Sequence, residues 1–111
     1  MPVTEDQLLD GITDALMVGG WRWWHIRRSD RALTMGDPGF PDIIAVHPVR
    51  GVLALELKTE TGRYRAGQRE WLAALDGKRI SARTVRPADY QALVDEVVGP
   101  RLVKRWKEPT P

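Results

Sequence analysis

The chain has 111 residues, a length that fits one compact domain. Hydrophobic residues make up 42% and charged residues 29%, which is typical of a folded domain and argues against disorder. No apolar run approaches the roughly 20 residues of a membrane span, and the acidic N-terminus lacks the features of a signal peptide. The absence of cysteine excludes disulfides and thiolate metal sites. The sequence therefore predicts a cytoplasmic protein without membrane contact.

The net charge is only +2, but the charges are unevenly distributed. Residues 1–20 carry four acids and no bases, whereas residues 58–86 carry eight bases and three acids. Residues 101–108 add four bases and one acid. A basic surface separated from an acidic helix is compatible with a polyanionic partner such as nucleic acid, and equally with an ordinary solvated surface. Charge alone leaves both interpretations open.

An amphipathic helix is predicted near the N-terminus. Thr4 is a suitable N-cap, apolar residues recur at helical spacing from Leu8 to Leu16, and the glycine pair at 19–20 ends the pattern. Stepping back along this stripe by three or four residues puts Glu5 on the same inward face. The stretch "WRWWHIRR" (21–28) predicts the first strand.

After a loop over 29–41, two strands are predicted at about 42–47 and 52–58, around the turn "HPVRG". A basic loop, "TGRYRAG", leads to a second helix from about Ala66 to Leu75. A strand near 80–86 and a helix near 88–98 complete the pattern.

The order αβββαβα has three sequential strands and a fourth that is reached through a helix. It predicts an α/β (α+β) domain with a mixed sheet flanked by helices. Residues 1–100 would form this single domain, and residues 101–111 a basic tail. The second helix should bury Trp71, Leu72 and Leu75.

Polar residues interrupt the predicted hairpin of "PDIIAVHPVRGVLALELKTE". Strand alternation places Glu56 and Lys58 on one face, about 6–7 Å apart along the strand, and leaves the leucines to the other. The polar face should therefore lie near solvent or line a cleft. Asp42 can come beside Glu56 if the hairpin pairs in register, which the sequence alone does not fix.

Two adjacent carboxylates repel each other unless a cation compensates. Oxygen ligands suit a hard divalent ion such as Mg²⁺ or Mn²⁺, which can orient a water, lower its pKa and stabilise charge on a phosphoryl oxygen. Lys58 could hold or deprotonate the attacking water, or neutralise the transition state. Gln68 falls on the inward side of its helix, where its amide could orient a ligand. The alternative is a solvated edge strand, which the convergence of Glu5 and Gln68 on the same place disfavours.

The stretch "GFPDIIAVHPVRGVLALELKTETGRYRAGQREWLAAL" resembles the VRR-NUC branch of the PD-(D/E)xK nuclease superfamily. The family pattern is Gly-x-Pro-Asp opening a strand, then Glu-x-Lys-Thr, a Gly-Arg loop, and a helix that starts with Gln. The matching residues are Gly39, Pro41, Asp42, Glu56, Lys58, Thr59, Gly62, Arg63 and Gln68. "GW" with "HxR" at 20–27 and "VRPADYQAL" from Val85 also look like small phage and bacterial members. The resemblance covers residues from about 4 to 97.

The resemblance implies a restriction-endonuclease-like fold and hydrolysis of phosphodiester bonds in DNA with Mg²⁺ or Mn²⁺, in a bacterial or phage-infected cell. Asp42 and Glu56 would be metal ligands with the Leu57 carbonyl, and Lys58 would serve the nucleophile. Glu5 would complete the site through water or a second metal, and Gln68 would support it.

Branched, flap or Holliday-junction DNA is the substrate that small stand-alone relatives suggest. Paired cutting of a junction requires two active sites, which makes a homodimer a reasonable expectation. A DNA-binding protein that keeps the fold but does not cut is the alternative function. A third possibility is an interaction module whose carboxylates are simply solvated.

Three arginines, Arg63, Arg65 and Arg69, lie around the loop that leads into the Gln68 helix. We expect them to contact phosphates rather than form only a solvated rim. His25 and Arg27 share a strand face, where approach to the DNA and simple solvation stay equally open.

The remaining aromatic side chains are assigned structural roles. The tryptophans at 21, 23 and 24 are predicted to pack in the core rather than stack on bases. His47 is predicted to be a solvated turn residue. The basic tail, with Trp106, could contact DNA or be solvated.

Overall fold

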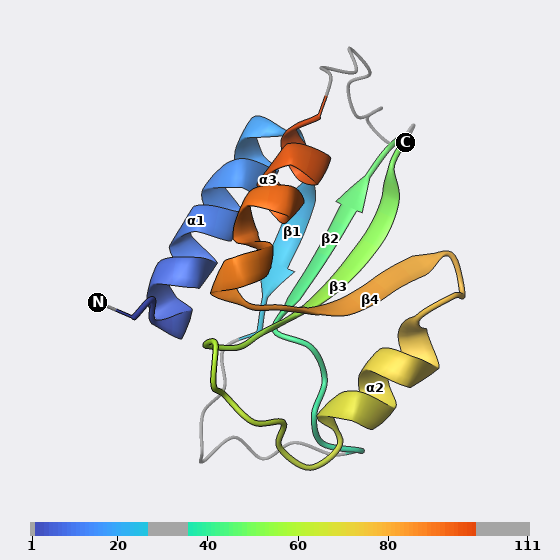
Figure 1. The fold of residues 1–111 in the computed structure, drawn as a ribbon. Helices are drawn as coiled ribbons and strands as arrows, with labels where there is room; N and C mark the ends of the chain where they lie inside the picture. Colours follow the sequence, from blue (N-terminus) through green and yellow to red (C-terminus); the bar gives the residue numbers. More distant parts are fainter. Residues whose placement is uncertain (1, 27–35, 100–111) are drawn as a thin grey trace.

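The computed structural model describes residues 2–26 and 36–99 (Figure 1). The elements are, in order, α1 (Glu5–Val18), β1 (Arg22–His25), β2 (Ile43–His47), β3 (Gly51–Leu57), α2 (Gln68–Leu75), β4 (Ile80–Val85), a short 3₁₀ helix (Pro87–Asp89) and α3 (Tyr90–Val98). This is the predicted order. The end of the predicted first strand, including Arg27, and the tail at 101–111 lie outside the described residues.

The four strands form one mixed sheet in the order β1-β2-β3-β4. The pairs β1–β2 and β2–β3 are antiparallel, whereas β3 and β4 are parallel and are joined through α2. The predicted α+β architecture, a mixed sheet flanked by helices, is therefore confirmed, and it fits a restriction-endonuclease-like fold. In the hairpin Ile43 pairs with Leu55, so Asp42 and Glu56 are the next residues along the two neighbouring strands.

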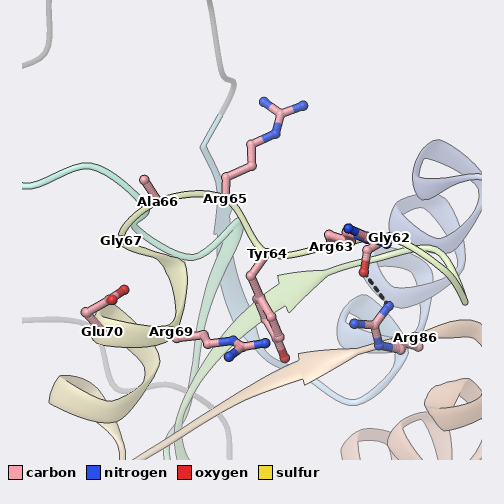
Figure 2. A pocket seen from close by; sticks show the side chains of 9 residues that line it. All are labelled: Gly62, Arg63, Tyr64, Arg65, Ala66, Gly67, Arg69, Glu70 and Arg86. Carbon is pink, nitrogen blue, oxygen red and sulfur yellow. Dashed lines mark hydrogen bonds between the residues drawn. The ribbon is translucent and has the colours of Figure 1, made fainter.

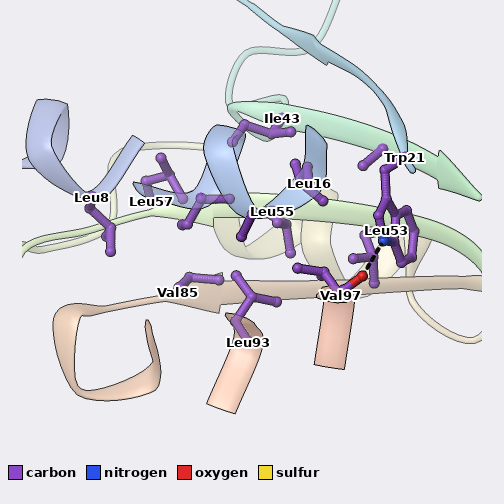
Figure 3. Close-up of a cluster of buried hydrophobic side chains, with 13 residues drawn as sticks. Leu8, Leu16, Trp21, Ile43, Leu53, Leu55, Leu57, Val85, Leu93 and Val97 are labelled. Atoms are coloured by element: carbon purple, nitrogen blue, oxygen red, sulfur yellow. Dashed lines mark hydrogen bonds between the residues drawn. The ribbon is translucent and has the colours of Figure 1, made fainter. Parts of the chain in front are cut away.

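The hydrophobic core lies between one face of the sheet and the helices α1 and α3, which run side by side (Figures 1 and 3). Leu53, Leu55 and Leu57 all face this core, as strand alternation predicted. Full burial of an aliphatic side chain contributes about 1.5–3 kcal/mol. The Trp21 indole adds a directional contact, because its Nε1 donates to the Val97 carbonyl at 2.9 Å and ties α3 to the start of β1.

Helix α1 begins as the sequence predicts. The Thr4 side chain accepts a hydrogen bond from the Gln7 amide at 3.1 Å, and the Gln7 side chain accepts one from the Thr4 amide at 3.0 Å. Glu5 occupies the first position of this helix and is exposed, so the inward placement that the stripe predicted is wrong for this side chain. The stripe becomes buried only from Leu8 onward. No helix among the described residues is both long and apolar enough to cross a bilayer.

Helix α2 differs from its prediction in start and in burial. It begins at Gln68, after Gly67 with φ +85°, and Gln68 is the residue that it buries. Trp71, Leu72 and Leu75 are only half-buried, because this short helix packs beside β3 and β4 without a further layer over it. Trp71 instead contacts the 36–41 loop, where its Nε1 donates to the Asp37 carbonyl at 3.1 Å.

The 36–41 loop and α2 approach each other at two glycines. A Cβ at Gly67 would lie 2.0 Å from the Pro38 carbonyl oxygen, and one at Gly39 would lie 2.4 Å from the Gly67 carbonyl carbon. Both glycines have positive φ, so neither position accommodates a side chain without strain. This close approach places the segment that leads into Asp42 against the start of α2.

Three aromatic predictions need correction. Trp21 is buried as expected, but Trp23 and Trp24 are 37% and 71% exposed because β1 is an edge strand. His47 is buried rather than solvated, since alternation puts it on the core face of β2. Its Nδ1 accepts hydrogen bonds from the amides of Val49 and Arg50, at 3.1 and 3.2 Å. Burial, followed by the Arg50 charge, lowers the pKa of His47 below 6.5, and a backbone hydrogen bond with Gly19 opposes this shift.

Candidate active site

The carboxylate of Asp42 is held by the neighbouring strand. Its Oδ2 accepts a hydrogen bond from the Leu57 amide at 2.7 Å, and its own carbonyl accepts one from the Ile26 amide at 2.9 Å. The N–H and C=O of one strand residue point toward the same edge, so the Leu57 carbonyl is directed toward the Asp42 side. The end of the hairpin therefore gathers a carboxylate and a backbone carbonyl.

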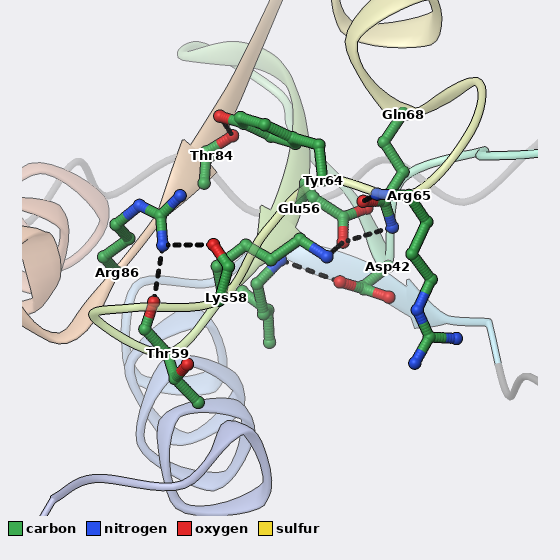
Figure 4. A network of polar contacts seen from close by, with 11 residues as sticks. Asp42, Glu56, Lys58, Thr59, Tyr64, Arg65, Gln68, Thr84 and Arg86 are labelled. Atoms are coloured by element: carbon green, nitrogen blue, oxygen red, sulfur yellow. Dashed lines mark hydrogen bonds and ion pairs between the residues drawn. The ribbon is translucent and has the colours of Figure 1, made fainter.

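Glu56, Lys58 and Gln68 form a buried polar group on the sheet face opposite the main core (Figure 4). The Gln68 Nε2 donates to Glu56 Oε2 at 3.1 Å, and the Lys58 ammonium lies 3.8 Å from the same oxygen. The Gln68 Oε1 in turn accepts from the Arg65 amide at 2.7 Å. Gln68 thus orients Glu56 and fixes the loop that precedes α2. Glu56 and Lys58 are only 2% and 4% exposed, so this face meets a cleft rather than open solvent.

That cleft is a pocket of about 380 Å³ lined by Glu5, Asp42, Glu56, Lys58, Gly62, Arg63 and Arg65. The structure therefore brings together seven of the residues that the sequence singled out, from α1, the hairpin and the following loop. Glu56 and Lys58 form its buried floor, whereas Glu5, Arg63 and Arg65 are exposed at its rim. Three acids and three bases therefore line one small pocket.

Other candidates lie elsewhere. Arg69 lines a neighbouring pocket, where its guanidinium is 4.8 Å from the centre of the Tyr64 ring. His25 does not line the carboxylate pocket, although β1 ends beside Asp42. Arg27 lies outside the described residues.

Carboxylate and carbonyl oxygens are the ligand type that a hard divalent cation prefers. In the part of the chain that the structure describes, however, no three acidic, histidine or cysteine side chains are grouped so that they could hold a metal ion together. Glu5 is therefore not placed with Asp42 and Glu56 for a single ion. Mg²⁺ typically uses one or two carboxylates and keeps several waters, so Asp42, Glu56 and the Leu57 carbonyl are oxygen donors of the type that this ion takes.

Sequence reasoning missed Tyr64, Thr84 and Arg86. The Tyr64 hydroxyl and Thr84 Oγ1 are 2.5 Å apart, which ties the loop after Lys58 to β4. Arg86 follows β4 and donates to carbonyls of the same loop. Arg86 lies in the family-like stretch "VRPADYQAL", but the roles of these residues depend on partners at least 20 positions away in the sequence, which local patterns do not reveal.

The mixed sheet, with two carboxylates and a lysine at the end of its central hairpin, is consistent with a restriction-endonuclease-like fold. The family model of the VRR-NUC domain matches residues 7–89. The chain belongs to the VRR-NUC family, and a nuclease domain implies DNA as its substrate. No curated protein matched the chain in a sequence search. No solved structure matched it either.

Proposed function

We propose that this protein is a divalent-metal-dependent DNA nuclease that hydrolyses phosphodiester bonds. The observation that carries the proposal is the single pocket that holds Asp42, Glu56 and Lys58 beneath exposed arginines. Carboxylates on two neighbouring strands suit a metal ion, while the arginines suit the phosphates of a nucleic acid strand. The family match over residues 7–89 supports the same conclusion.

Asp42, Glu56 and the Leu57 carbonyl would hold Mg²⁺ or Mn²⁺, which when bound polarises the phosphoryl oxygen and lowers the pKa of a water. Lys58 is 3.8 Å from Glu56 and is nearly buried, so its ammonium can orient the nucleophilic water or offset negative charge that develops on the phosphate. Gln68 keeps the Glu56 carboxylate in place through the 3.1 Å hydrogen bond.

The rim residues have a separate role in this proposal. Arg63 and Arg65 are exposed and line the pocket, so their guanidinium groups can contact phosphates on either side of the cleaved bond. Arg69 would extend this contact along the neighbouring pocket. Glu5, also at the rim, would bind a water or a second metal.

A cleavage assay tests the proposal. Labelled duplex, single-stranded, flap and four-way-junction DNA are incubated with the protein and with Mg²⁺, Mn²⁺ or EDTA. We expect cleavage that needs the metal and that Asp42→Asn and Lys58→Met abolish. Asn at position 42 keeps an oxygen that can accept from the Leu57 amide, so this variant should remain folded, which circular dichroism checks.

The results also separate the rival functions. If the protein binds DNA but cleaves no substrate with any metal, it is the non-cleaving DNA-binding protein. If it neither binds nor cleaves DNA, both functions are excluded. Paired cuts at symmetric positions of the junction, together with a dimer in light scattering, would support a homodimeric junction nuclease.

A further inference from the structure

The segment at 58–67, here called the 58–67 loop, joins β3 to α2 and carries the catalytic candidate Lys58 together with Arg63 and Arg65. It has no helix or strand of its own, yet its residues line the pocket of the candidate active site. Its geometry must therefore be fixed by contacts to other elements. These contacts come from α2, through Gln68, and from β4 and the residues that follow it.

Arg86 makes the most extensive contact with the 58–67 loop. Its Nη1 donates to the carbonyl oxygens of Thr59 at 2.6 Å (Figure 4) and Gly62 at 2.9 Å (Figure 2), with a longer contact of 3.4 Å to the Glu60 carbonyl oxygen. Its guanidinium also lies 5.9 Å from the centre of the Tyr64 ring. One side chain thus holds both ends of the turn that separates Lys58 from Arg63.

The contact is reinforced by the backbone around Arg86. The Val85 carbonyl accepts a hydrogen bond from the Lys58 amide at 3.0 Å, so β4 holds the backbone of the catalytic candidate directly. In the other direction, the Glu60 carboxylate accepts a hydrogen bond from the Ala88 amide. The Arg86 amide is itself fixed, because it donates to Asp89 Oδ2 at 2.9 Å. The two segments are therefore joined by donors and acceptors from both sides.

We propose that Arg86 is a positioning residue for DNA cleavage, which holds the 58–67 loop so that Lys58 and Arg63 keep their places beside the carboxylates. This inference rests on the nuclease function proposed above. All of these hydrogen bonds come from Nη1, and the planar, rigid guanidinium fixes the direction of this donor, whereas a lysine ammonium is a flexible point charge. Small displacements of catalytic groups, about 1 Å, reduce rates by about 10²-fold.

A direct contact between Arg86 and DNA is the competing interpretation. Arg86 also lines the neighbouring pocket of about 550 Å³, together with Arg63, Arg65 and Arg69 (Figure 2). A phosphate ligand in that pocket would give Arg86 a binding role instead. The two roles differ in what they change, because a phosphate contact contributes to DNA affinity and its salt dependence, and a loop contact contributes to the rate of the bound complex.

Arg83, on β4 three residues before Arg86, offers a matched control. It forms an ion pair with Glu96 at 2.8 Å, with side chains that are 37% and 47% exposed, and it does not line the pocket of the candidate active site. The variants Arg86→Lys, Arg86→Ala, Arg83→Lys and Arg83→Ala are compared for single-turnover cleavage at saturating protein, for DNA affinity at several salt concentrations, and for hydrogen exchange of the 58–67 loop.

We expect Arg86→Ala to lower the single-turnover rate by about 10²-fold and Arg86→Lys by less. Because the rate is measured at saturating protein, a loss of DNA affinity through a displaced Arg63 does not contribute to this decrease. Methylguanidinium should restore part of the rate of Arg86→Ala but none of that of Lys58→Met. Amides of the 58–67 loop should exchange faster in Arg86→Ala, while amides of the sheet stay protected. The Arg83 variants should match the wild type in every measurement of cleavage and loop exchange.

Three results would overturn the inference. One is an unchanged rate or unchanged loop exchange in Arg86→Ala. Another is weaker DNA binding with a salt slope reduced by about 1 and a normal rate once DNA is bound, which would show a phosphate contact. The third is faster exchange throughout the sheet, with activity that follows the folded fraction. If the wild type cuts no substrate, the nuclease proposal fails by itself, and loop exchange still decides whether Arg86 holds the loop.

Discussion

Replacement of Gln68 by leucine should destabilise the protein strongly, although the side chain belongs to a short helix at the edge of the fold. Gln68 is fully buried, donates to the Glu56 carboxylate at 3.1 Å and accepts from the Arg65 amide at 2.7 Å. A hydrogen bond to a charged group contributes about 1.5–3 kcal/mol, and one between neutral groups about 1 kcal/mol. Leucine has a similar volume but makes neither, so we expect a loss of about 3 kcal/mol in the free energy of unfolding.

Urea unfolding followed by circular dichroism measures this loss, and a fall of about 10 °C or more in Tm should accompany it. Gln91→Leu is the control, because Gln91 donates to Asp95 at 3.0 Å on an exposed helix surface. Its effect should stay within about 0.5 kcal/mol. An equal, small effect for both variants would refute the reasoning, since it would mean that the buried Glu56 carboxylate is not stabilised by the hydrogen bond from the Gln68 amide.

Three further predictions concern stability and DNA binding. The pKa of His47 is lowered in the folded state, so the unfolded chain binds the proton first as the pH falls. The contribution of His47 to stability should be fully present above the unfolded pKa of 6.5 and should decrease as the pH drops below it. Urea unfolding from about pH 7.5 to about pH 5.5 should therefore show a weaker pH dependence of the unfolding free energy in His47→Asn than in the wild type. Gly77→Ala should cost about 1 kcal/mol from its φ of +81° alone, whereas Gly67→Ala should cost clearly more because its Cβ would also meet the Pro38 carbonyl; equal unfolding free energies would contradict this. Arg65→Gln should reduce the salt slope of DNA binding by about 1 while its amide still bonds to Gln68, and an unchanged slope in fluorescence anisotropy would exclude a phosphate contact.

The sequence predicted the parts of the site that follow from local periodicity. Strand alternation put Glu56 and Lys58 on the same face, and helical spacing put Gln68 on the inward side of α2. The register that brings Asp42 beside Glu56 had to come from the structure, because the turn between the strands does not fix it. Each of these placements depends on one element or on two that are adjacent in the chain.

Predictions failed where a residue's environment is set by distant elements. Trp23 and Trp24 carry strong strand preference, but an edge strand has no neighbour to cover them. His47 lies next to a turn and is nevertheless buried against Trp21, with ring centres 5.1 Å apart. The loop contact of Arg86 could not be predicted for the same reason, because the carbonyls it binds belong to a loop more than 20 residues away.

The candidate site also divides its tasks between rigid and irregular parts of the fold. The proposed metal ligands lie on or next to paired strands, where the Leu57 amide and the Gln68 side chain fix the two carboxylates. The proposed phosphate contacts lie on the 58–67 loop, whose geometry depends on a few hydrogen bonds to Arg86, Thr84 and Gln68. Because the carboxylates do not depend on the Arg86 contacts, loosening the loop at Arg86 should leave the proposed metal-binding oxygens in place. If the protein is the proposed nuclease, metal affinity and cleavage rate should therefore be separable, and a variant that loses only the cleavage rate would locate the defect in the loop.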